Sequence, residues 1–273
     1  MVRSLWSAAT GMKSEQTAVD TIANNIANVN TTGFKAQDTQ FKSLLYQTLQ
    51  VETTSRNGET TPGSAQVGLG VRVSSVNSVF RQGAQLANEN NMAMCINGEG
   101  FFQVRGADNN LYYTRDGNFG WTLNENGGRI LTNQNGNPVM DVAGNRITLP
   151  DGVGTAGVSI SQSGAVAYRT PAGDTVLTGQ IVSLHQFPNK VGLKKVSSNL
   201  YQQTEASGAA INENTTNLNV TRSTMAQGYL EGSNVNLADE MVNLIISQRA
   251  YELNSRAITT SDSMLDTANN LKR

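Results

Sequence analysis

Apolar residues recur every seven positions near both ends of this chain of 273 residues, and no other feature of the sequence constrains the fold as strongly. Near the N-terminus the repeat falls on Leu5, Met12, Val19 and Ile26. Near the C-terminus it falls on Leu237, Leu244, Tyr251, Ile258 and Leu265. A spacing of seven residues places side chains on one stripe of an α-helix, and such stripes let helices pack as a coiled coil. The sequence therefore predicts a long helix at each end of the chain.

Both predicted helices have recognisable limits. We expect the N-terminal helix to end at residues 31–34, where Gly33 suits a left-handed stop. The C-terminal helix can be capped by Ser233 or Asn234, and it extends over roughly 35 residues, or about 50 Å. Its first turn carries acidic residues that suit the helix dipole, Asp239 and Glu240.

Between these helices the pattern changes to short segments separated by turn signals. Asn-Gly or Asp-Gly pairs favour tight turns between strands. They occur at residues 57–58, 97–98, 116–117, 126–127, 135–136 and 151–152. Residues 101–104 and 181–184 are predicted to be strands. We therefore predict an α+β protein, in which long N- and C-terminal helices form a coiled-coil domain with an inserted all-β domain.

The same reading divides the chain into three regions. A discontinuous helical coiled-coil domain is expected at 1–35 and 229–273, and a β-rich domain at 91–199. An extended or β-hairpin connecting region is expected at 36–90 and 200–228. Within it, a polar tract with Gly and Pro predicts a loop at about 46–66.

Composition excludes several classes of protein. The net charge is −1 and no Lys/Arg block occurs, so no nucleic-acid partner is expected. Cys95 is the only cysteine and His185 the only histidine, so we expect no internal disulfide, metal site or cofactor; Cys95 is expected to be a buried small hydrophobe and His185 to be structural. No run of about 18 apolar residues occurs, so we expect neither membrane insertion nor a cleaved signal peptide.

The acidic residues of the central region do not form a recognisable catalytic pattern. Glu99, Asp108, Asp116 and Asp141 could be imagined as a glycosidase pair, which needs two carboxylates about 5–10 Å apart in a cleft. Each of them has Gly or Asn beside it or nearby, as turn residues do. We therefore predict that the chain is not an enzyme.

The terminal stripes favour assembly with other copies of the chain. Positions facing away from the repeat are mainly Asn, Ser, Thr, Gln and Ala, so these faces can also be buried without stranding charges. The periodicity alone leaves open a second reading, an intramolecular two-helix stalk on a β domain. A further alternative, from a different functional class, is a β module that binds cell-wall carbohydrate and carries helical arms.

Residues 22–35, IANNIANVNTTGFK, resemble the signature that closes the N-terminal helix in the rod and hook family of the bacterial flagellum. Other stretches agree in the same order along the chain: RSLW at 3–6, INGEGFFQV at 96–104, YTRDGNF at 113–119, NLY at 199–201, QGYLEGSNVN at 227–236 and QRAYE at 248–252. One departure lies at residues 92–96, MAMCI, where the family pattern carries an acidic residue. The compact length and the tract at 46–66 are most similar to distal rod members.

The resemblance implies a structural subunit of the distal rod, which polymerises into a straight hollow tube, crosses the periplasm and transmits motor torque to the hook. Another rod or hook subunit is the nearest alternative. The implied partners are copies of the chain, proximal rod proteins, the hook protein, surrounding ring proteins of the basal body and the flagellar export apparatus. The residues predicted at the subunit interface are Leu5, Met12, Val19, Ile22, Asn24, Asn25, Ile26, Asn28, Gly33, Phe34, Leu237, Leu244, Tyr251, Ile258 and Leu265.

Overall fold

The computed structural model describes residues 2–50, 65–123, 128–150, 153–170, 174–197, 199–214 and 221–271. The fold is α+β, as predicted, with a helix near each end and a mostly β body. Two compact units make up the chain. Unit 1 comprises residues 1–27, 37–78 and 236–273, and unit 2 comprises residues 28–36 and 79–235.

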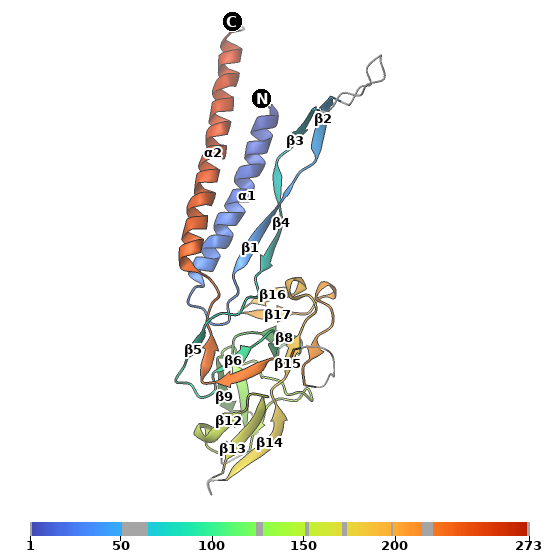
Figure 1. The fold of residues 1–273 in the computed structure, drawn as a ribbon, viewed down its shortest axis with the longest axis vertical. Coiled ribbons are helices and arrows are strands. Elements are labelled where there is room, and N and C mark those ends of the chain that lie inside the picture. Colours follow the sequence, from blue (N-terminus) through green and yellow to red (C-terminus); the bar gives the residue numbers. More distant parts are fainter. Residues whose placement is uncertain are drawn as a thin grey trace. The chain divides into compact units, whose positions relative to one another are not determined.

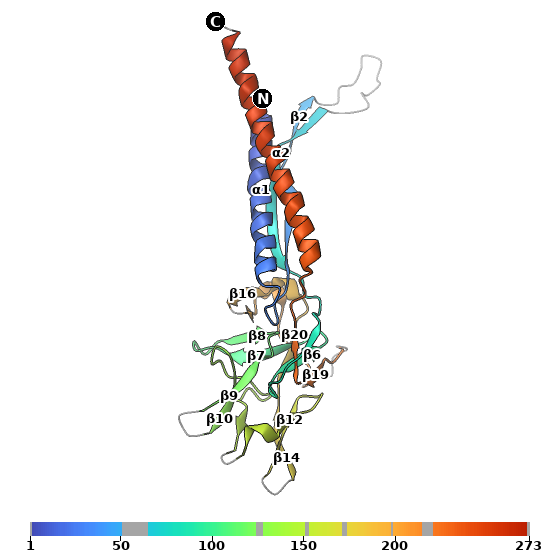
Figure 2. The ribbon, with the colours of Figure 1, turned by 90° about the vertical axis from the view of Figure 1, so that its left-hand side faces the viewer.

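Unit 1 is built from two helices and two β-ribbons (Figure 1). Helix α1 (Val2–Ala27) and helix α2 (Leu237–Asn270) run antiparallel and side by side in both ribbon views (Figures 1 and 2). Strands β1 (Gln37–Ser43) and β4 (Val71–Ser78) pair antiparallel and pack along α1. Strands β2 (Tyr46–Gln50) and β3 (Ala65–Gly68) form a second antiparallel ribbon. The loop predicted at about 46–66 begins in β2, and its residues 51–64 lie outside the described residues.

The helix limits differ in part from the prediction. Helix α1 ends at Ala27, so the expected stop at residues 31–34 is wrong, although Gly33 does adopt the left-handed conformation with φ +67°. Helix α2 is capped by Asn236, whose side chain accepts a hydrogen bond from the amide of Ala238, and not by Ser233 or Asn234. Its length of 34 residues and its acidic first turn agree with the prediction.

Unit 2 contains the larger sheets. One six-stranded antiparallel sheet holds, in spatial order, β16 (Lys194–Ser197), β17 (Leu200–Gln202), β8 (Leu111–Thr114), β7 (Phe101–Arg105), β15 (Leu184–Gln186) and β18 (Ile211–Asn212). Two three-stranded sheets are β11 (Thr148–Leu149), β10 (Arg129–Asn133), β9 (Phe119–Leu123), and β12 (Val158–Ile160), β13 (Ala165–Arg169), β14 (Thr175–Ile181). Two further antiparallel pairs are β19 (Thr224–Gln227) with β6 (Met94–Asn97), and β20 (Tyr229–Glu231) with β5 (Gln85–Ala87). Three short 3-10 turns lie at Thr155–Gly157, Lys190–Gly192 and Glu205–Ser207.

Strand β7 separates two hydrophobic clusters of unit 2. Successive side chains of a strand point to opposite faces of its sheet. Phe102 packs edge-to-face on Phe119 in the main core, with a centroid distance of 5.0 Å. Phe101 belongs to the second cluster, where its ring centroid lies 5.7 Å from that of Phe187. Both faces of the strand are therefore buried, and residues 101–104 lie within a strand, as predicted.

The second predicted strand, at residues 181–184, is interrupted. Strand β14 ends at Ile181 and β15 begins at Leu184. The amide of Ile181 donates to Oδ1 of Asp141 (3.0 Å), and the amide of Val182 donates to the carbonyl of Gly164 (2.9 Å). Because these residues bond to different partners, the chain changes sheet between the two strands.

Candidate subunit interface

The contacts between α1 and α2 follow a seven-residue register of small and polar residues. The observed pairs are Ser4 with Ser261, Gly11 with Asn254, and Asn25 with Glu240. The first two pairs lie seven residues apart on each helix and the last two lie fourteen apart, in opposite directions, as antiparallel helices require. Ala18 and Ser247 occupy the remaining step, and both are buried. We call this line of contact between α1 and α2 the seam. Large apolar residues do not fill its centre.

Small side chains also fill most of the buried face of α1. Ala8, Gly11, Ser14, Ala18 and Thr21 are buried, whereas the predicted residues Leu5, Met12, Val19, Ile22 and Ile26 are half-buried. A Cβ placed on Gly11 would lie 2.9 Å from Nδ2 of Asn254, so a larger residue here would displace the Asn254 side chain or the helix. The large apolar residues of α1 consequently flank the line of closest approach.

Helix α2 is apolar on two faces. Leu244, Ile258 and Leu265 are half-buried, each four positions after a residue that contacts α1. A second set of large apolar side chains is 53–65% exposed: Met241, Val242, Ile245, Ile246, Leu253 and Met264. We call this set the outer face of α2. Exposed large apolar side chains gathered on one face of a helix mark a candidate contact surface, so the outer face is such a candidate. Leu237 and Tyr251 of the predicted set are also exposed.

Two open grooves flank α1 within unit 1. One, of about 420 Å³, is lined by Gln16, Val19, Gln248, Tyr251 and Glu252. The other, of about 250 Å³, lies among α1, β1 and α2 and includes Ile22, Phe41 and Ile246 in its lining. Each groove places predicted interface residues beside polar side chains that can be buried with hydrogen bonds. Such grooves suit the side chains of a neighbouring helix.

The predicted asparagines have contacts within the chain. Asn25 is 1% exposed: its Nδ2 donates to the carbonyl of Gln37 (2.8 Å) and to Glu240, and its Oδ1 accepts from the amide of Gln37 (2.8 Å). Asn24 donates from Nδ2 to Oε1 of Gln37 (3.0 Å), and Asn28 accepts a bond from the hydroxyl of Thr31 (3.1 Å). Burial raises the pKa of Glu240, and the hydrogen bond from Asn25 acts in the opposite direction. Asn25 thus fastens the start of β1 to the helix pair.

Gly33 and Phe34 are buried in unit 2. The amide of Gly33 donates to the carbonyl of Glu231 (2.8 Å), and a Cβ on Gly33 would lie 2.6 Å from the backbone nitrogen of Asp116. The ring of Phe34 is 2% exposed and lies 4.5 Å from Nζ of Lys195. These two residues anchor the segment that follows α1. The place of all fifteen predicted residues in a subunit interface stays a prediction.

The imagined catalytic residues serve turns and surface contacts. Glu99 is exposed and pairs with Lys190 at 2.6 Å, which lowers its pKa. Asp108 accepts a bond from Tyr112, and Asp116 accepts one from Thr32. Among the described residues, no three His, Cys, Asp or Glu side chains gather as a metal site would need.

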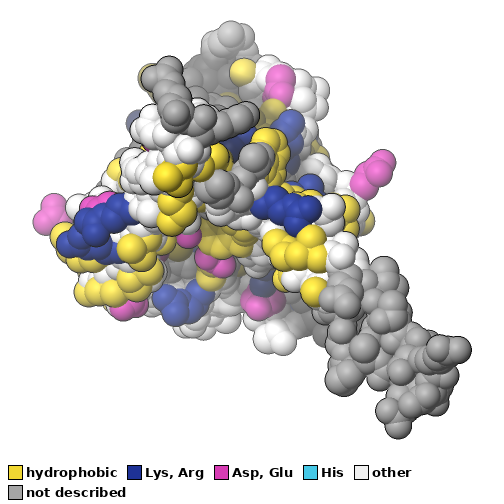
Figure 3. All heavy atoms as spheres, turned by 90° about the horizontal axis from the view of Figure 1, so that it is seen from above, with side chains coloured by type: hydrophobic (Ala, Val, Ile, Leu, Met, Phe, Trp, Pro, Cys, Tyr) yellow, Lys and Arg dark blue, Asp and Glu magenta, His cyan; other side chains and the backbone are white. Residues whose placement is uncertain are grey.

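Cys95 and His185, the single cysteine and the single histidine of the chain, are both buried. Cys95 is fully buried in β6, as predicted. His185 is buried beside Ser183 (Nδ1 to Oγ, 3.2 Å), and burial lowers its pKa to about 4. On the described part of the face drawn in Figure 3, Lys and Arg side chains lie among Asp and Glu and form no continuous area of one sign. Within the described residues, neither helix is long and apolar enough to span a bilayer.

Comparisons with known proteins agree along the whole chain. Three family models match: "Flagella basal body rod protein" at residues 5–35, "Flagellar hook protein FlgE/F/G D1 domain" at 95–168, and "Flagellar basal body rod FlgEFG protein C-terminal" at 226–271. The flagellar basal-body rod protein FlgG of Buchnera aphidicola is 42% identical over 97% of this chain and 98% of its own length.

Two other bacteria carry similar proteins. The FlgG proteins of Borreliella burgdorferi and Bacillus subtilis are each 38% identical, and in both cases the match covers 100% of both chains. Identity at this level over the full length is sufficient to assign a family. This chain belongs to the flagellar basal-body rod protein family, whose members are structural proteins and not enzymes.

Proposed function

We propose that the chain is a subunit of the flagellar distal rod, which polymerises into a straight hollow tube, crosses the periplasm and transmits motor torque to the hook. The observation that carries the proposal is the outer face of α2, whose large apolar side chains are more than half exposed. In the polymer, these side chains contact the helices of neighbouring copies. The helices then form the inner wall of the tube and the β units form its outer wall.

The free energy of burying these side chains favours a polymer over a single pair of copies. Burying the exposed part of six large apolar side chains contributes roughly 5–10 kcal/mol per copy. Association costs an estimated 4–15 kcal/mol in lost translational and rotational freedom. One outer face therefore roughly balances the cost of a single pairwise encounter. A helical array, in which each copy contacts several neighbours, provides the surplus.

We also propose that the predicted interface residues lie between copies of the chain. The chain would divide, as expected, into a helical domain, a connecting region and a β-rich domain. The helices would pack as a coiled coil in the assembled tube. The partners would be further copies of the chain, proximal rod proteins, the hook protein, surrounding ring proteins and the flagellar export apparatus. Export would occur without a cleaved signal peptide. Neither nucleic acid nor membrane insertion has a part in this scheme.

A deletion strain tests the proposal. We expect loss of motility and, in electron micrographs of isolated basal bodies, rods that stop short of the hook. Complementation with the wild-type chain should restore both, and complementation with Leu253→Asp should restore neither. Complete hook-basal bodies in the deletion strain would contradict the proposal.

Another rod or hook subunit is the second candidate, because one of the three matching models describes the D1 domain of hook protein. The two candidates differ in the shape of the polymer. A hook subunit forms a curved tube and a rod subunit a straight one. Electron microscopy of polymers assembled from the purified chain separates them: straight tubes support the rod, and curved tubes support the hook.

A further inference from the structure

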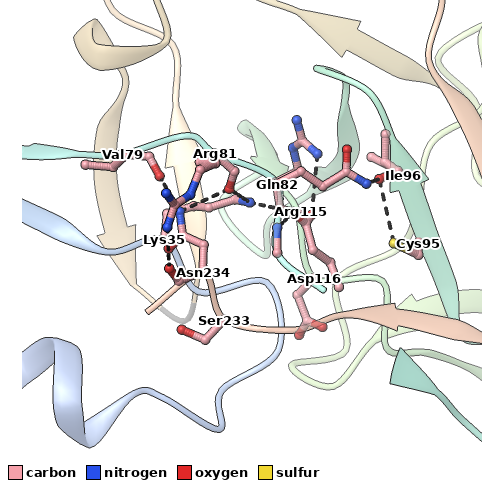
Figure 4. A network of polar contacts seen from close by, with 12 residues as sticks. Lys35, Val79, Arg81, Gln82, Cys95, Ile96, Arg115, Asp116, Ser233 and Asn234 are labelled. Carbon is pink, nitrogen blue, oxygen red and sulfur yellow. Dashed lines mark hydrogen bonds and ion pairs between the residues drawn. The ribbon is translucent and has the colours of Figure 1, made fainter. Parts of the chain in front are cut away.

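The backbone passes between unit 1 and unit 2 at four points, after residues 27, 36, 78 and 235. Three segments of unit 2 adjoin these points: 28–36, 79–84 and 231–235. Inside unit 2, these segments are joined by a dense network of polar contacts (Figure 4). We call Lys35, Arg115, Glu231 and Asn234 the junction cluster. Two of its side chains, those of Glu231 and Asn234, lie on the third segment and contact the other two.

Asn234 joins the three segments with one side-chain amide. Its Oδ1 accepts from the amide of Ala36 (2.7 Å), and its Nδ2 donates to the carbonyls of Val79 (2.8 Å) and Arg81 (3.0 Å). The amide of Val79 donates in turn to the carbonyl of Ala36 (2.8 Å). Only a side chain with both a donor and an acceptor makes this set of bonds, so an aspartate at position 234 would keep the first bond and lose the other two.

Glu231 makes a second set of bonds with the same segments. It is 1% exposed, and its Oε1 accepts from Nζ of Lys35 (2.5 Å) and from the amide of Gly83 (3.0 Å). Its backbone carbonyl accepts from the amide of Gly33 (2.8 Å). Lys35 also donates to the carbonyl of Arg81 (2.8 Å). The side chain and the main chain of Glu231 therefore bind both segment 28–36 and segment 79–84.

The charges of the cluster are fully enclosed. The side chains of Lys35 and Glu231 are 0% exposed and that of Arg115 is 2% exposed. Arg115 lies 3.4 Å from Oε2 of Glu231 and donates to the carbonyl of Gly98 (2.7 Å). Burial lowers the pKa of Lys35, while Glu231 acts in the opposite direction. A buried ion pair adds little net stability, but removing one partner is costly because the other charge remains buried and unpaired. Such a cluster therefore favours one arrangement of its segments over all others.

We propose that the junction cluster is a mechanical staple, which locks the three connecting segments together so that force applied to unit 1 passes into the β body without separating them. This inference rests on the proposed function, in which the chain carries torque. Bonds that join several segments side by side share an applied load, and none of them has to bear it alone. The cluster thus holds the three segments that lead towards unit 1 together within the β body.

Backbone hydrogen exchange of the purified full-length chain tests the staple directly. We expect Asn234→Ala to raise the exchange rate of the amides of Ala36 and Val79 at least tenfold, while amides of the six-stranded sheet keep their protection. Asn234→Asp should restore protection at Ala36 alone, because the carboxylate can still accept that bond. As a control, Glu99→Gln removes a surface ion pair of the same unit and should change none of these amides. Unchanged exchange at Ala36 and Val79 in Asn234→Ala would overturn the staple.

Swimming under load tests the mechanical role. Cells carrying Asn234→Ala should build complete basal bodies and swim in dilute buffer, but their speed in viscous medium should fall at least twofold further than that of the wild type. Equal speeds in viscous medium, with the exchange pattern altered as expected, would overturn the force-transmitting role. Neither outcome depends on the deletion experiment above, so a failure of the staple is distinguishable from a failure of the rod assignment.

Discussion

The side chain of Asn254 on α2 lies against Gly11 of α1. A Cβ on this glycine would lie 2.9 Å from Nδ2 of Asn254. This pair is one step of the seven-residue register that also joins Ser4 with Ser261 and Asn25 with Glu240. Because small and polar residues occupy the seam, the spacing of the helices depends on them. The large apolar residues are left to the flanks of the pair and to the outer face of α2.

A large side chain at Gly11 should therefore disturb the helix pair. Gly11→Leu forces α1 away from Asn254, and overpacking of this kind costs about 1–3 kcal/mol. We expect a lower midpoint of urea unfolding, followed by far-ultraviolet circular dichroism. Ala9→Leu is the matched control, because Ala9 is exposed on the same helix. Equal midpoints for the two variants would show that the seam does not require a small residue.

Gly33 should tolerate substitution far less than another left-handed glycine of unit 2. Gly33→Ala adds the strain of a positive φ and a collision with the backbone of Asp116, and we expect a loss of roughly 3 kcal/mol or more. Gly136 has φ +79° but nothing within 4 Å of its Cβ position, so Gly136→Ala should cost only about 1–2 kcal/mol. Chemical denaturation of both variants measures the difference. Equal losses would mean that the close approach to Asp116 does not matter.

His185 should make the protein less stable in mild acid. Burial lowers its pKa from 6.5 to about 4, so between these values the unfolded chain binds a proton that the folded chain does not. The free energy of unfolding is therefore highest above pH 6.5 and falls as the pH drops towards 4, by up to about 3 kcal/mol from this group. The chain has one histidine, so the difference between wild type and His185→Gln isolates the effect. If the free energy of unfolding changed with pH in the same way in both proteins, the role of His185 would be contradicted.

Cys95 should be unreactive in the folded protein. Its side chain is fully buried, and burial raises the pKa of the thiol to about 11. At pH 8 we expect a thiol reagent to modify it only after unfolding in urea, because the thiolate is the reactive form and reagent cannot reach it. Because β6, which carries Cys95, pairs with β19, any slow modification without urea measures how often that strand pair opens. Modification of the native protein at the rate of a free thiol would rule out this burial.

The sequence predicted the helices well, because Leu244, Ile258 and Leu265 recur at a period that only a helix explains. The seam between them was predicted less well. Periodicity gives weight to large apolar residues, whereas Gly11, which faces Asn254, and Ala18, which is buried, carry no such signal. Where both faces of a helix bear apolar residues, the pattern alone does not say which face is covered within the chain.

The junction cluster was not predictable from the sequence. Lys35 and Glu231 are 196 positions apart, and neither lies in a pattern that indicates a buried charge. Charged residues are normally assigned to the surface because burial is costly unless they are paired. Their pairing arises only once the strands of unit 2 have brought the segments together. Asn234, one of the two residues predicted to cap α2, instead serves this cluster.

The proposed function requires that copies of the chain cover the outer face of α2. Because Cys95 is buried, a cysteine introduced at Leu253, which is 65% exposed, would be the reactive thiol of the variant. Leu177, 70% exposed on β14, provides the control position. Maleimide labelling of Leu253→Cys should be rapid in the monomer and at least tenfold slower in isolated basal bodies. Labelling of Leu253→Cys at the same rate in monomer and basal bodies would contradict the account.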